Sequence, residues 1–209
     1  VLEMGIREAH ERRKKFFLTV NTLPHNSKLK TFMSDMEPLI EMKPDALIMA
    51  DPGLIMNVRE RWPEMPIHLS VQANTTNYWG VKFWQKMGVE RIILSRELSI
   101  EELAELRQEC PDTEIEVFVH GALCIAYSGR CLLSGYFNHR DPNQGTCTNA
   151  CRWDYKVHEA GDSDAGDAQL LSGFNFNQAQ EEANSAFEGI NGQVRHPAAD
   201  KVFLIEEAN

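Results

Sequence analysis

The sequence lacks several features that would place it in common classes of protein. No apolar run is long enough to span a bilayer, and the N-terminus has no charged-then-apolar signal pattern. No glycine-rich phosphate-binding loop follows a predicted strand, and neither an H-E-x-x-H zinc motif nor a G-x-S-x-G elbow is present. We therefore expect a cytoplasmic protein that is neither a membrane protein nor a common nucleotide-binding domain, zinc peptidase or serine hydrolase.

Cysteine is scarce outside one part of the chain. Four of the five cysteines fall within residues 121–153, and the fifth, Cys110, ends a predicted helix. The spacing of the four is Cys124-x6-Cys131-x15-Cys147-x3-Cys151. Because there is no export signal and the count is odd, disulfide bonds are a weak interpretation.

Metal binding is a stronger interpretation of this spacing. Structural zinc sites normally use cysteine pairs separated by two to four residues, and only Cys147 and Cys151 approach that pattern. An iron–sulfur cluster needs four soft thiolates and tolerates varied spacing, and the intervening glycines allow loops to wrap around it. Zinc is kept as the fallback, and four ordinary buried cysteines are the alternative that needs no cofactor.

The net charge of −10 is unevenly distributed. Residues 154–209 contain 11 acidic and 3 basic side chains, a net charge of −8, which leaves −2 for the first 153 residues. Between Gly121 and Arg140 there are two arginines and no acidic residue. Because local potential steers contact with a polyanion, the acidic total does not exclude a nucleic-acid partner. A solvated basic face explains the same residues equally well.

Strands and helices alternate through the first 121 residues. Five short runs rich in β-branched and aromatic residues predict strands, and the intervals between them have helical spacing or capping signals. The predicted strands are residues 16–21, 46–51, 66–72, 91–97 and 114–121, and the predicted helices are residues 28–42, 52–62, 75–87 and 99–110. This alternation indicates an α/β protein with a parallel sheet, and the apolar runs indicate strands buried on both faces.

Two architectures fit this alternation, an open doubly wound sheet and a closed (β/α) barrel of the TIM type. The missing phosphate-binding loop weakens the first. Polar residues at the carboxyl ends of the strands favour the second, because barrel active sites lie there. These residues are Asn21, Asp51, Gln72, Asn74, Arg96, Glu97 and His120. A barrel needs about eight units, so residues 1–155 are predicted to be a partial barrel-like domain with five to six strands.

The remaining residues have a different character. Residues 156–199 are rich in Gly, Ser, Asn, Asp and Glu with little periodicity, which predicts a flexible acidic insertion. Residues 200–209, "DKVFLIEEAN", predict the start of a further strand. Because the first residues are typical of the middle of a helix, we expect the chain to be part of a longer protein.

Two residues of the fifth predicted strand are candidate catalytic groups. Glu116 and His120 are four residues apart, so on a strand they would face the same side and could share a proton-transfer task. An equally good explanation is that Glu116 is paired inside the barrel and His120 orients a loop. Other side chains near the strand ends and the cysteines are candidates for binding substrate, by stacking on a nucleobase or gripping phosphate. They are Arg96, Tyr127, Arg130 and Arg152.

Several stretches closely resemble known signatures. "EVFVHGALCIAYSGRCLLSGY" and "RDPNQGTCTNACRW" resemble the collagenase-like peptidase family, peptidase family U32. "NSKLKTFMSDMEPLIEMKPDALIMADPGLIM", "MPIHLSVQANTTNYWGVKFWQKMG" and "ILSRELSIEEL" resemble the branch of that family whose members hydroxylate tRNA. Motifs of this length are highly specific. The resemblance covers about residues 5–155 and resumes at "DKVFLIEEA", so we expect the family's first strand, later barrel strands and C-terminal domain to be missing.

The resemblance implies a barrel-like domain with a 4Fe–4S iron–sulfur cluster, ligated by Cys124, Cys131, Cys147 and Cys151. It also implies 5-hydroxylation of the wobble uridine of tRNA, with prephenate as co-substrate. Hydroxylating an unactivated uracil carbon is redox chemistry that needs a cofactor, whereas hydrolysis needs no such cluster. We therefore expect a tRNA-modifying enzyme. The alternatives are a peptidase, which is the family's older label, and a non-catalytic protein whose cluster is structural or senses redox state.

Overall fold

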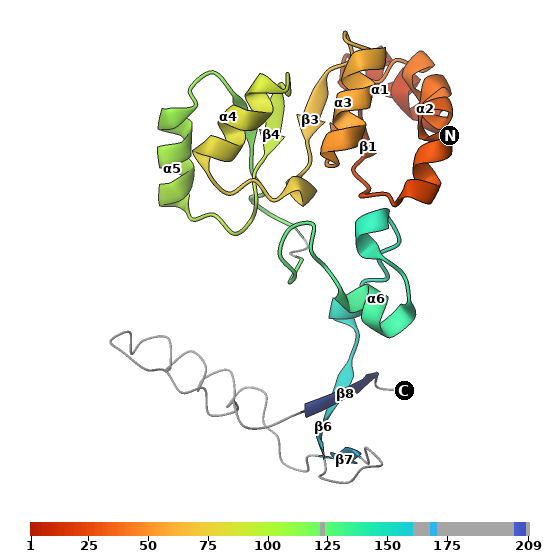
Figure 1. Cartoon of the computed structure of the whole chain (residues 1–209), viewed down its shortest axis with the longest axis vertical. Coiled ribbons are helices and arrows are strands. Elements are labelled where there is room, and N and C mark those ends of the chain that lie inside the picture. Colours follow the sequence, from red (N-terminus) through yellow and green to blue (C-terminus); the bar gives the residue numbers. More distant parts are fainter. Residues whose placement is uncertain (122–123, 161–167, 171–202, 208–209) are drawn as a thin grey trace. The chain divides into compact units, whose positions relative to one another are not determined.

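The computed structural model of the chain describes residues 1–121, 124–160, 168–170 and 203–207. The chain divides into two compact units, Val1–Cys151 and Arg152–Asn209, and Figure 1 labels most of their helices and strands. Among the described residues, no helix has the length and apolar character needed to cross a membrane. Every predicted site residue except Arg152 belongs to the first unit.

Strands and helices alternate in the first unit, as the sequence predicts. The strands are β1 (Phe17–Val20), β2 (Ala46–Met49), β3 (Ile67–Leu69), β4 (Arg91–Ile93) and β5 (Glu114–Glu116). The α-helices are α1 (Leu2–Glu11), α2 (Asn26–Glu41), α3 (Pro52–Arg61), α4 (Tyr78–Lys86), α5 (Ile100–Glu109) and α6 (Leu133–Asn138). Short 3-10 turns follow β3 and lie near the cysteines, at η1 (Val71–Ala73), η2 (Pro142–Gln144) and η3 (Ala150–Arg152).

The five strands form one parallel sheet in the order β1-β2-β3-β4-β5. A doubly wound sheet reverses its strand order at a switch point, and this order contains no reversal. The doubly wound alternative is therefore excluded for this unit. Within the described residues β1 and β5 are the two edges of the sheet, so the structure shows an open five-stranded sheet and not the closed barrel.

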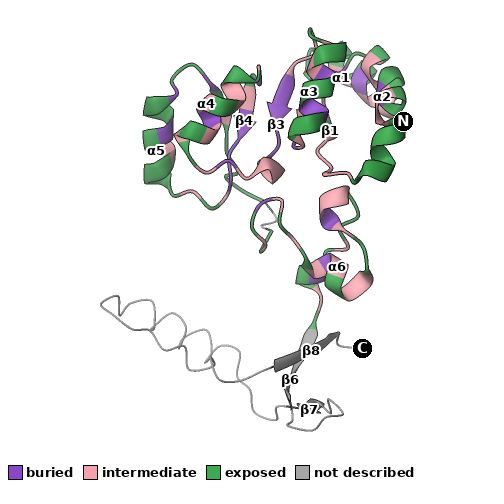
Figure 2. Cartoon of the chain, in the orientation of Figure 1, coloured by how far each residue is buried: buried purple, intermediate pink, exposed green. Residues whose placement is uncertain are grey.

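The hydrophobic core lies between one face of the sheet and the helices. Alternate residues of a strand point to the same face, and Leu47, Met49 and Ile67 are fully buried against Ile55 and Val58 of α3. Figure 2 shows the buried segments on the strands and on one side of the neighbouring helices. Burying each such side chain stabilises the fold by about 1.5–3 kcal/mol. The sheet and helices thus form a framework that holds the strand ends in place.

The other face of the sheet becomes polar toward the β5 edge. The parallel register places Ile48, His68, Arg91 and Glu114 in one row across β2 to β5. Ile48 is half-buried and His68 is buried, whereas Glu114 is exposed. The predicted burial on both faces is therefore found on the central strand β3 and not on the edge strand β5.

Buried His68 makes the stability of this unit depend on pH. Burial, together with the nearby Arg91, lowers the pKa of His68 from 6.5 to about 4. Its ring lies edge-on to Phe17, with ring centroids 4.6 Å apart. A group whose pKa is lower in the folded state contributes its full stability above the unfolded pKa and loses it as the pH falls through the folded pKa. The free energy of unfolding should therefore fall between about pH 6.5 and pH 4.

The expected size of this decline is about 3 kcal/mol, since the pKa of His68 falls from 6.5 to about 4 and each pKa unit corresponds to about 1.4 kcal/mol. Substituting His68→Gln should flatten the decline, measured as the difference in urea-unfolding free energy between neutral and acidic pH. The exposed His25 offers a matched control, and His25→Gln should leave the decline unchanged. Equal declines in both variants would remove His68 as the cause.

Capping signals begin the helices close to the predicted positions. The Asp51 carboxylate accepts a hydrogen bond from Leu54 N at 2.9 Å and starts α3. The predicted capping box is present, because Ser99 Oγ accepts from Glu102 N at 3.2 Å and the Glu102 carboxylate accepts from Ser99 N at 2.7 Å. Each such cap is worth about 1 kcal/mol. Asn77 caps α4, so that helix begins later than predicted.

Strand β5 is shorter than predicted. The sequence predicts a strand over residues 114–121, whereas β5 ends at Glu116. Its partner β4 ends at Ile93, and the last hydrogen bond of the pair runs from Leu94 N to Glu116 O at 2.9 Å. Because a strand needs a partner for its backbone groups, the pairing stops where β4 stops. His120 therefore lies outside the strand, and the face it shares with Glu116 in the prediction does not exist.

The second unit contains a small antiparallel sheet in the order β7-β6-β8. Its strands are β6 (Tyr155–Ala160), β7 (Ala168–Leu170) and β8 (Phe203–Glu207). The sequence predicts a flexible insertion over residues 156–199, and β7 and most of β6 lie within it. The rest of that stretch is outside the described residues. Strand β8 falls within residues 200–209, where the sequence predicts a strand.

Candidate cysteine-lined site at the carboxyl ends of the strands

Polar side chains that follow different strands meet at the carboxyl ends of the sheet. Asn21, after β1, donates a hydrogen bond from Nδ2 to Ser70 Oγ, after β3, at 3.0 Å. Asn74 Nδ2 donates to Ser95 Oγ, after β4, at 3.2 Å. Two of the strand-end residues predicted to converge, Asn21 and Asn74, are thus bonded to serines that follow other strands. They form a polar rim around this end of the sheet.

The cysteine segment, residues 124–151, is held on this rim by Glu97. The Glu97 carboxylate accepts hydrogen bonds from Ser128 N at 2.9 Å and from Ser128 Oγ at 3.2 Å. Burial would raise the pKa of Glu97, but the hydrogen bonds from Ser128 and from Ser95 outweigh it, and the pKa lies below its usual value. Glu97 therefore stays ionised at neutral pH, and its charge strengthens both bonds to the buried Ser128.

Two backbone contacts complete this attachment. Gly129 has a φ of +72°, and a Cβ atom there would lie 2.0 Å from Gln72 O, closer than any side chain can come. Leu23 N, after β1, donates to Asn143 O at 2.9 Å, and Asn143 Nδ2 donates to Cys131 O at 3.1 Å. The segment is therefore fastened to the loops that follow β1, β3 and β4.

The four clustered cysteines line one cavity of about 210 Å³. All five cysteines of the chain are free thiols, so the structure contains no disulfide bond. Cys110 is buried away from this cavity, where its thiol donates to Tyr78 O at 3.8 Å. The strand-end residues Asn21, Gln72 and Arg96 also line the cavity. The segment thus places its thiols at the end of the sheet where active sites of barrel enzymes lie.

The donor set of this cavity fits an iron–sulfur cluster in its chemistry. Four soft thiolates on one cavity are the ligands that such clusters use. Among the described residues, no three His, Cys, Asp or Glu side chains are arranged to hold a single metal ion. One zinc ion would need its thiolates about 2.3 Å away around one point, whereas a four-iron body spreads them apart. Cys124, Cys131, Cys147 and Cys151 are the residues of this cavity that could hold such a group.

Cys147 also has a neighbour suited to tuning its thiolate. Asn149 adopts a left-handed backbone with a φ of +56° and donates its backbone N–H to Cys147 Sγ at 3.4 Å. Asparagine tolerates this conformation better than most residues. Hydrogen bonds to ligating sulfurs adjust the properties of iron–sulfur clusters. The sequence did not single out Asn149, which contacts Cys147 in this way.

The predicted substrate-binding residues are not all in one place. Arg96 and Tyr127 line the cysteine cavity, and the Tyr127 side chain is 66% exposed. Arg130 is exposed and lines none of the cavities described here, although it follows Tyr127 in a turn closed by Arg130 N and Tyr127 O at 3.0 Å. Arg152 is exposed and follows Cys151 directly, in the second unit.

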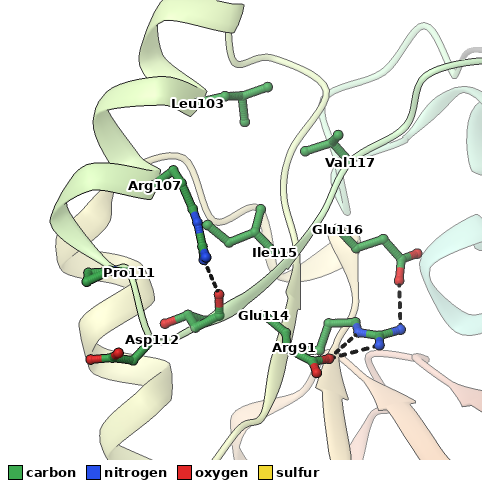
Figure 3. A pocket seen from close by; sticks show the side chains of 10 residues that line it. Arg91, Leu103, Arg107, Pro111, Asp112, Glu114, Ile115, Glu116 and Val117 are labelled. Atoms are coloured by element: carbon green, nitrogen blue, oxygen red, sulfur yellow. Dashed lines mark hydrogen bonds and ion pairs between the residues drawn. The ribbon is translucent and has the colours of Figure 1, made fainter.

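The predicted catalytic pair, Glu116 and His120, is not brought together. Glu116 lies at a different cavity of about 680 Å³, where Arg91 reaches both Glu114 and Glu116 (Figure 3). Arg91 donates from Nε to Glu114 at 2.9 Å and from an Nη atom to Glu116 at 3.3 Å. These contacts match the paired state that the sequence analysis kept as the alternative for Glu116. His120 is exposed and lines a separate cavity of about 530 Å³.

Sequence reasoning missed Ser128, Asn143 and Asn149, and it gave Gly129 only a general role as one of the intervening glycines. Each acts through a contact with a residue distant in the chain or through its own backbone conformation, which no periodicity or spacing signals. Gly129 alone carried a hint, because glycine is common where the backbone adopts a positive φ. The strand-end positions of Asn21, Gln72 and Glu97 did signal that these residues belong to the site.

The structure defines the chain as an α/β protein with a parallel sheet and a cavity at the carboxyl ends of its strands that four cysteines line. The model of peptidase family U32 matches residues 1–188, and the chain therefore belongs to that family. The chain is 59% identical over 99% of its length to tRNA hydroxylation protein P of Escherichia coli, covering 44% of that protein. It is 60% identical over 99% of its length to tRNA hydroxylation protein P of Haemophilus influenzae, also covering 44%.

A more distant relative also modifies RNA. The chain is 34% identical over 72% of its length to a 23S rRNA 5-hydroxycytidine synthase of Escherichia coli, covering 22% of that protein. A solved U32 peptidase is similar over 56% of this chain and 49% of its own, with 16% identity and a TM-score of 0.46. The chain thus spans less than half the length of the curated relatives that it matches over its whole length.

Proposed function

We propose that the full-length protein takes part in 5-hydroxylation of the wobble uridine of tRNA, with prephenate as co-substrate. In this proposal Cys124, Cys131, Cys147 and Cys151 hold a 4Fe–4S cluster. The names of the relatives support the RNA substrate class, since two hydroxylate tRNA and a third makes a 5-hydroxylated pyrimidine in ribosomal RNA.

The observation that carries this proposal is the convergence of four thiols on one cavity at the carboxyl ends of the strands. When bound there, a cluster would supply one-electron redox chemistry that side chains lack. The cavity is also bordered by Arg96 and Tyr127, so a substrate could approach the same place. A structural cluster would not need such a position, because it could lie anywhere in the fold.

The side chains around the cavity suit a flipped base on a tRNA loop. Tyr127 presents an exposed aromatic ring, on which an unpaired base could stack. Arg130 and Arg152 lie within one residue of Cys131 and Cys151 in the chain and carry charge that phosphate groups attract. Asn149 orients and tunes the Cys147 thiolate through its backbone N–H. These residues bind and position, and none of them performs the oxidation.

We also propose that the five-stranded sheet is part of a (β/α) barrel in the longer protein. The chain-order sheet and the helical core on one face are what five consecutive units of such a barrel would have. The face that would line the barrel carries His68, Arg91 and Glu114, and polar residues are expected there more than in a sheet covered on both sides.

Peptidase activity is the second candidate, and the family description is the observation that favours it. The predicted pair of Glu116 and His120 would be its acid–base groups, but these residues line different cavities. A gelatin substrate offers a direct test. Cleavage that survives Cys124→Ser and is lost in His120→Ala would favour the peptidase over the hydroxylase.

The test of the proposed function is nucleoside mass spectrometry of tRNA from a deletion strain. Deletion should remove 5-hydroxyuridine and its derivatives, and the full-length gene should restore them. A gene carrying Cys131→Ser should fail to restore them, while Cys110→Ser, at the buried cysteine outside the cavity, should restore them fully. Unchanged 5-hydroxyuridine-derived nucleosides in the deletion strain would refute the proposal.

A further inference from the structure

Helix α4 exposes two aromatic side chains on the face that points away from the sheet. Trp79 is 70% exposed and Phe83 is 52% exposed, and they lie one helical turn apart. The other side of the helix packs against the core through Val81, Tyr78 and Trp84. Packing of the sheet therefore does not explain why Trp79 and Phe83 are aromatic. Exposed apolar patches with a polar rim are typical of interaction sites.

Two lysines lie on the same face of α4. Lys82 follows Trp79 by three residues. Lys86 follows Phe83 by the same interval, so the four side chains share one face of the helix. Together with Gln85 they line one hollow on this surface, and none of these five residues is acidic. The Lys82 ammonium lies 5.4 Å from the centroid of the Trp79 ring, so this face combines aromatic rings with positive charge.

The two lysines differ in how far their charge is already used. Lys82 Nζ donates to the Glu109 carboxylate at 2.7 Å, on helix α5, which lies beside α4 in Figure 1. Both side chains of this ion pair are partly exposed, so water and salt weaken it. Lys86 is exposed and forms no ion pair among the residues that the structure describes. This face of α4 therefore has positive charge available for a polyanion.

The first turn of α4 belongs to the same end of the sheet as the cysteine cavity. Gln72, which lines that cavity, lies in the loop that leads from β3 into α4. Asn74 fixes this loop to the polar rim by donating from Nδ2 to Ser95 Oγ at 3.2 Å, and Asn77 then caps the helix. Trp79 follows directly in the first turn. A chain-like ligand that enters the cysteine cavity would thus pass the start of α4.

We propose that this aromatic and basic face of α4 binds the anticodon loop of the tRNA beside the nucleotide that enters the cysteine cavity. An unpaired base stacks on the Trp79 ring, and Lys82 and Lys86 contact the neighbouring phosphates. This inference rests on the proposed function for its choice of RNA. It extends that function by assigning a second binding surface outside the cysteine cavity.

A protein partner is the other occupant that an exposed aromatic face suits. Lysine is depleted in protein–protein interfaces, whereas two of the five residues that line this hollow are lysines. A single-stranded nucleic acid needs aromatic rings for its bases and positive charge for its phosphates, and α4 presents both together. The face therefore fits RNA better, and the two occupants predict different effects of the same substitutions.

Filter binding of a tRNA transcript with a wobble uridine to the anaerobically purified full-length protein tests the inference. Trp79→Ala should weaken tRNA binding about fivefold to a hundredfold, as expected for the loss of one stacked base. Trp79→Phe, which keeps an aromatic ring, should recover most of that loss. Lys86→Gln should weaken binding and reduce the slope of log affinity against log salt by about one, whereas Lys86→Arg should keep both.

Ile100→Ala is the matched control for the loss of an exposed apolar side chain. Ile100 is 80% exposed in the first turn of α5, next to two glutamates, so this variant should bind tRNA as the unmodified protein does. Anticodon stem-loops in which the loop nucleotides are made abasic one at a time locate the stacked base. At one position the abasic loop should bind the unmodified protein more weakly but should cause no further loss in Trp79→Ala.

Unchanged tRNA affinity in Trp79→Ala would overturn the inference, and so would an equal loss of affinity in Ile100→Ala. A lower melting temperature of Trp79→Ala with unchanged tRNA affinity would show that a protein surface covers α4, which also overturns it. If the tRNA nucleoside test fails while Trp79→Ala still weakens tRNA binding, the proposed function is removed and this RNA-binding face stands.

Discussion

Replacing Cys131 by serine in the full-length protein is expected to remove most of its iron. The anaerobically purified protein should contain about four irons and four sulfides per chain, as a four-thiolate cluster requires. Cys131 lines the cavity with the three other clustered cysteines, and its backbone carbonyl is fixed by Asn143. Serine is a poor ligand for iron in such clusters, so the variant should lose the broad visible absorption of the cluster together with iron and sulfide.

Cys110→Ser is the control that this chain supplies. Cys110 is a buried free thiol at the end of α5 and does not line the cavity. Its substitution tests the general effect of losing a thiol, and iron content should stay the same. Zinc in place of iron in the unmodified protein, or full iron in Cys131→Ser, would contradict the assignment of the cavity as a cluster site.

The second large effect is expected from Gly129→Ala. A Cβ atom at this position would lie 2.0 Å from Gln72 O, and the φ of +72° is itself costly for alanine. The backbone must move, so the cysteine segment should detach from the loop after β3. We expect a loss of unfolding free energy of about 2–3 kcal/mol, faster proteolysis within residues 124–151, and a large loss of bound iron.

Gly135→Ala is the matched substitution. The nearest atom to a Cβ there is Arg140 O at 3.9 Å, and the residue lies in α6, where alanine is favoured. Stability and iron content should therefore be unchanged or slightly higher. Glu97→Gln should cause a smaller loss of stability and bound iron than Gly129→Ala, because it weakens the hydrogen bonds from Ser128 without a steric clash. If Gly129→Ala keeps full iron and normal proteolysis, the attachment of the segment is not what forms the cavity.

The charged side chains of strands β4 and β5 and of the loop after β4 differ in whether they are paired with one another. Arg91, Glu114 and Glu116 satisfy one another on the sheet, and the hydrogen bond with Arg91 lowers the pKa of Glu114. Arg96 has no such partner among the described residues and stands between two cavities.

Local signals predicted the elements of the fold well. The capping residues Asp51 and Ser99 accept hydrogen bonds from backbone N–H groups three residues later, so a short stretch of sequence is enough to predict where these helices begin. The five strands and their polar carboxyl ends followed from periodicity and residue type, and Asn21, after β1, meets Ser70, after β3, at that end of the sheet. The spacing of the four cysteines likewise predicted that they act as one group.

Contacts between distant residues decided the rest. Glu116 and His120 seemed to share a strand, but the length of β5 is set by its partner β4, which no feature of residues 114–121 reveals. The position of the cysteine segment depends on the close contact of Gly129 with Gln72 O and on the hydrogen bond from Ser128 to Glu97. The sequence by itself determined which residues could hold a cofactor and which strands would carry them. Only the tertiary structure decided that the thiols share one cavity and that Arg96 faces a second, because both depend on loops packing together.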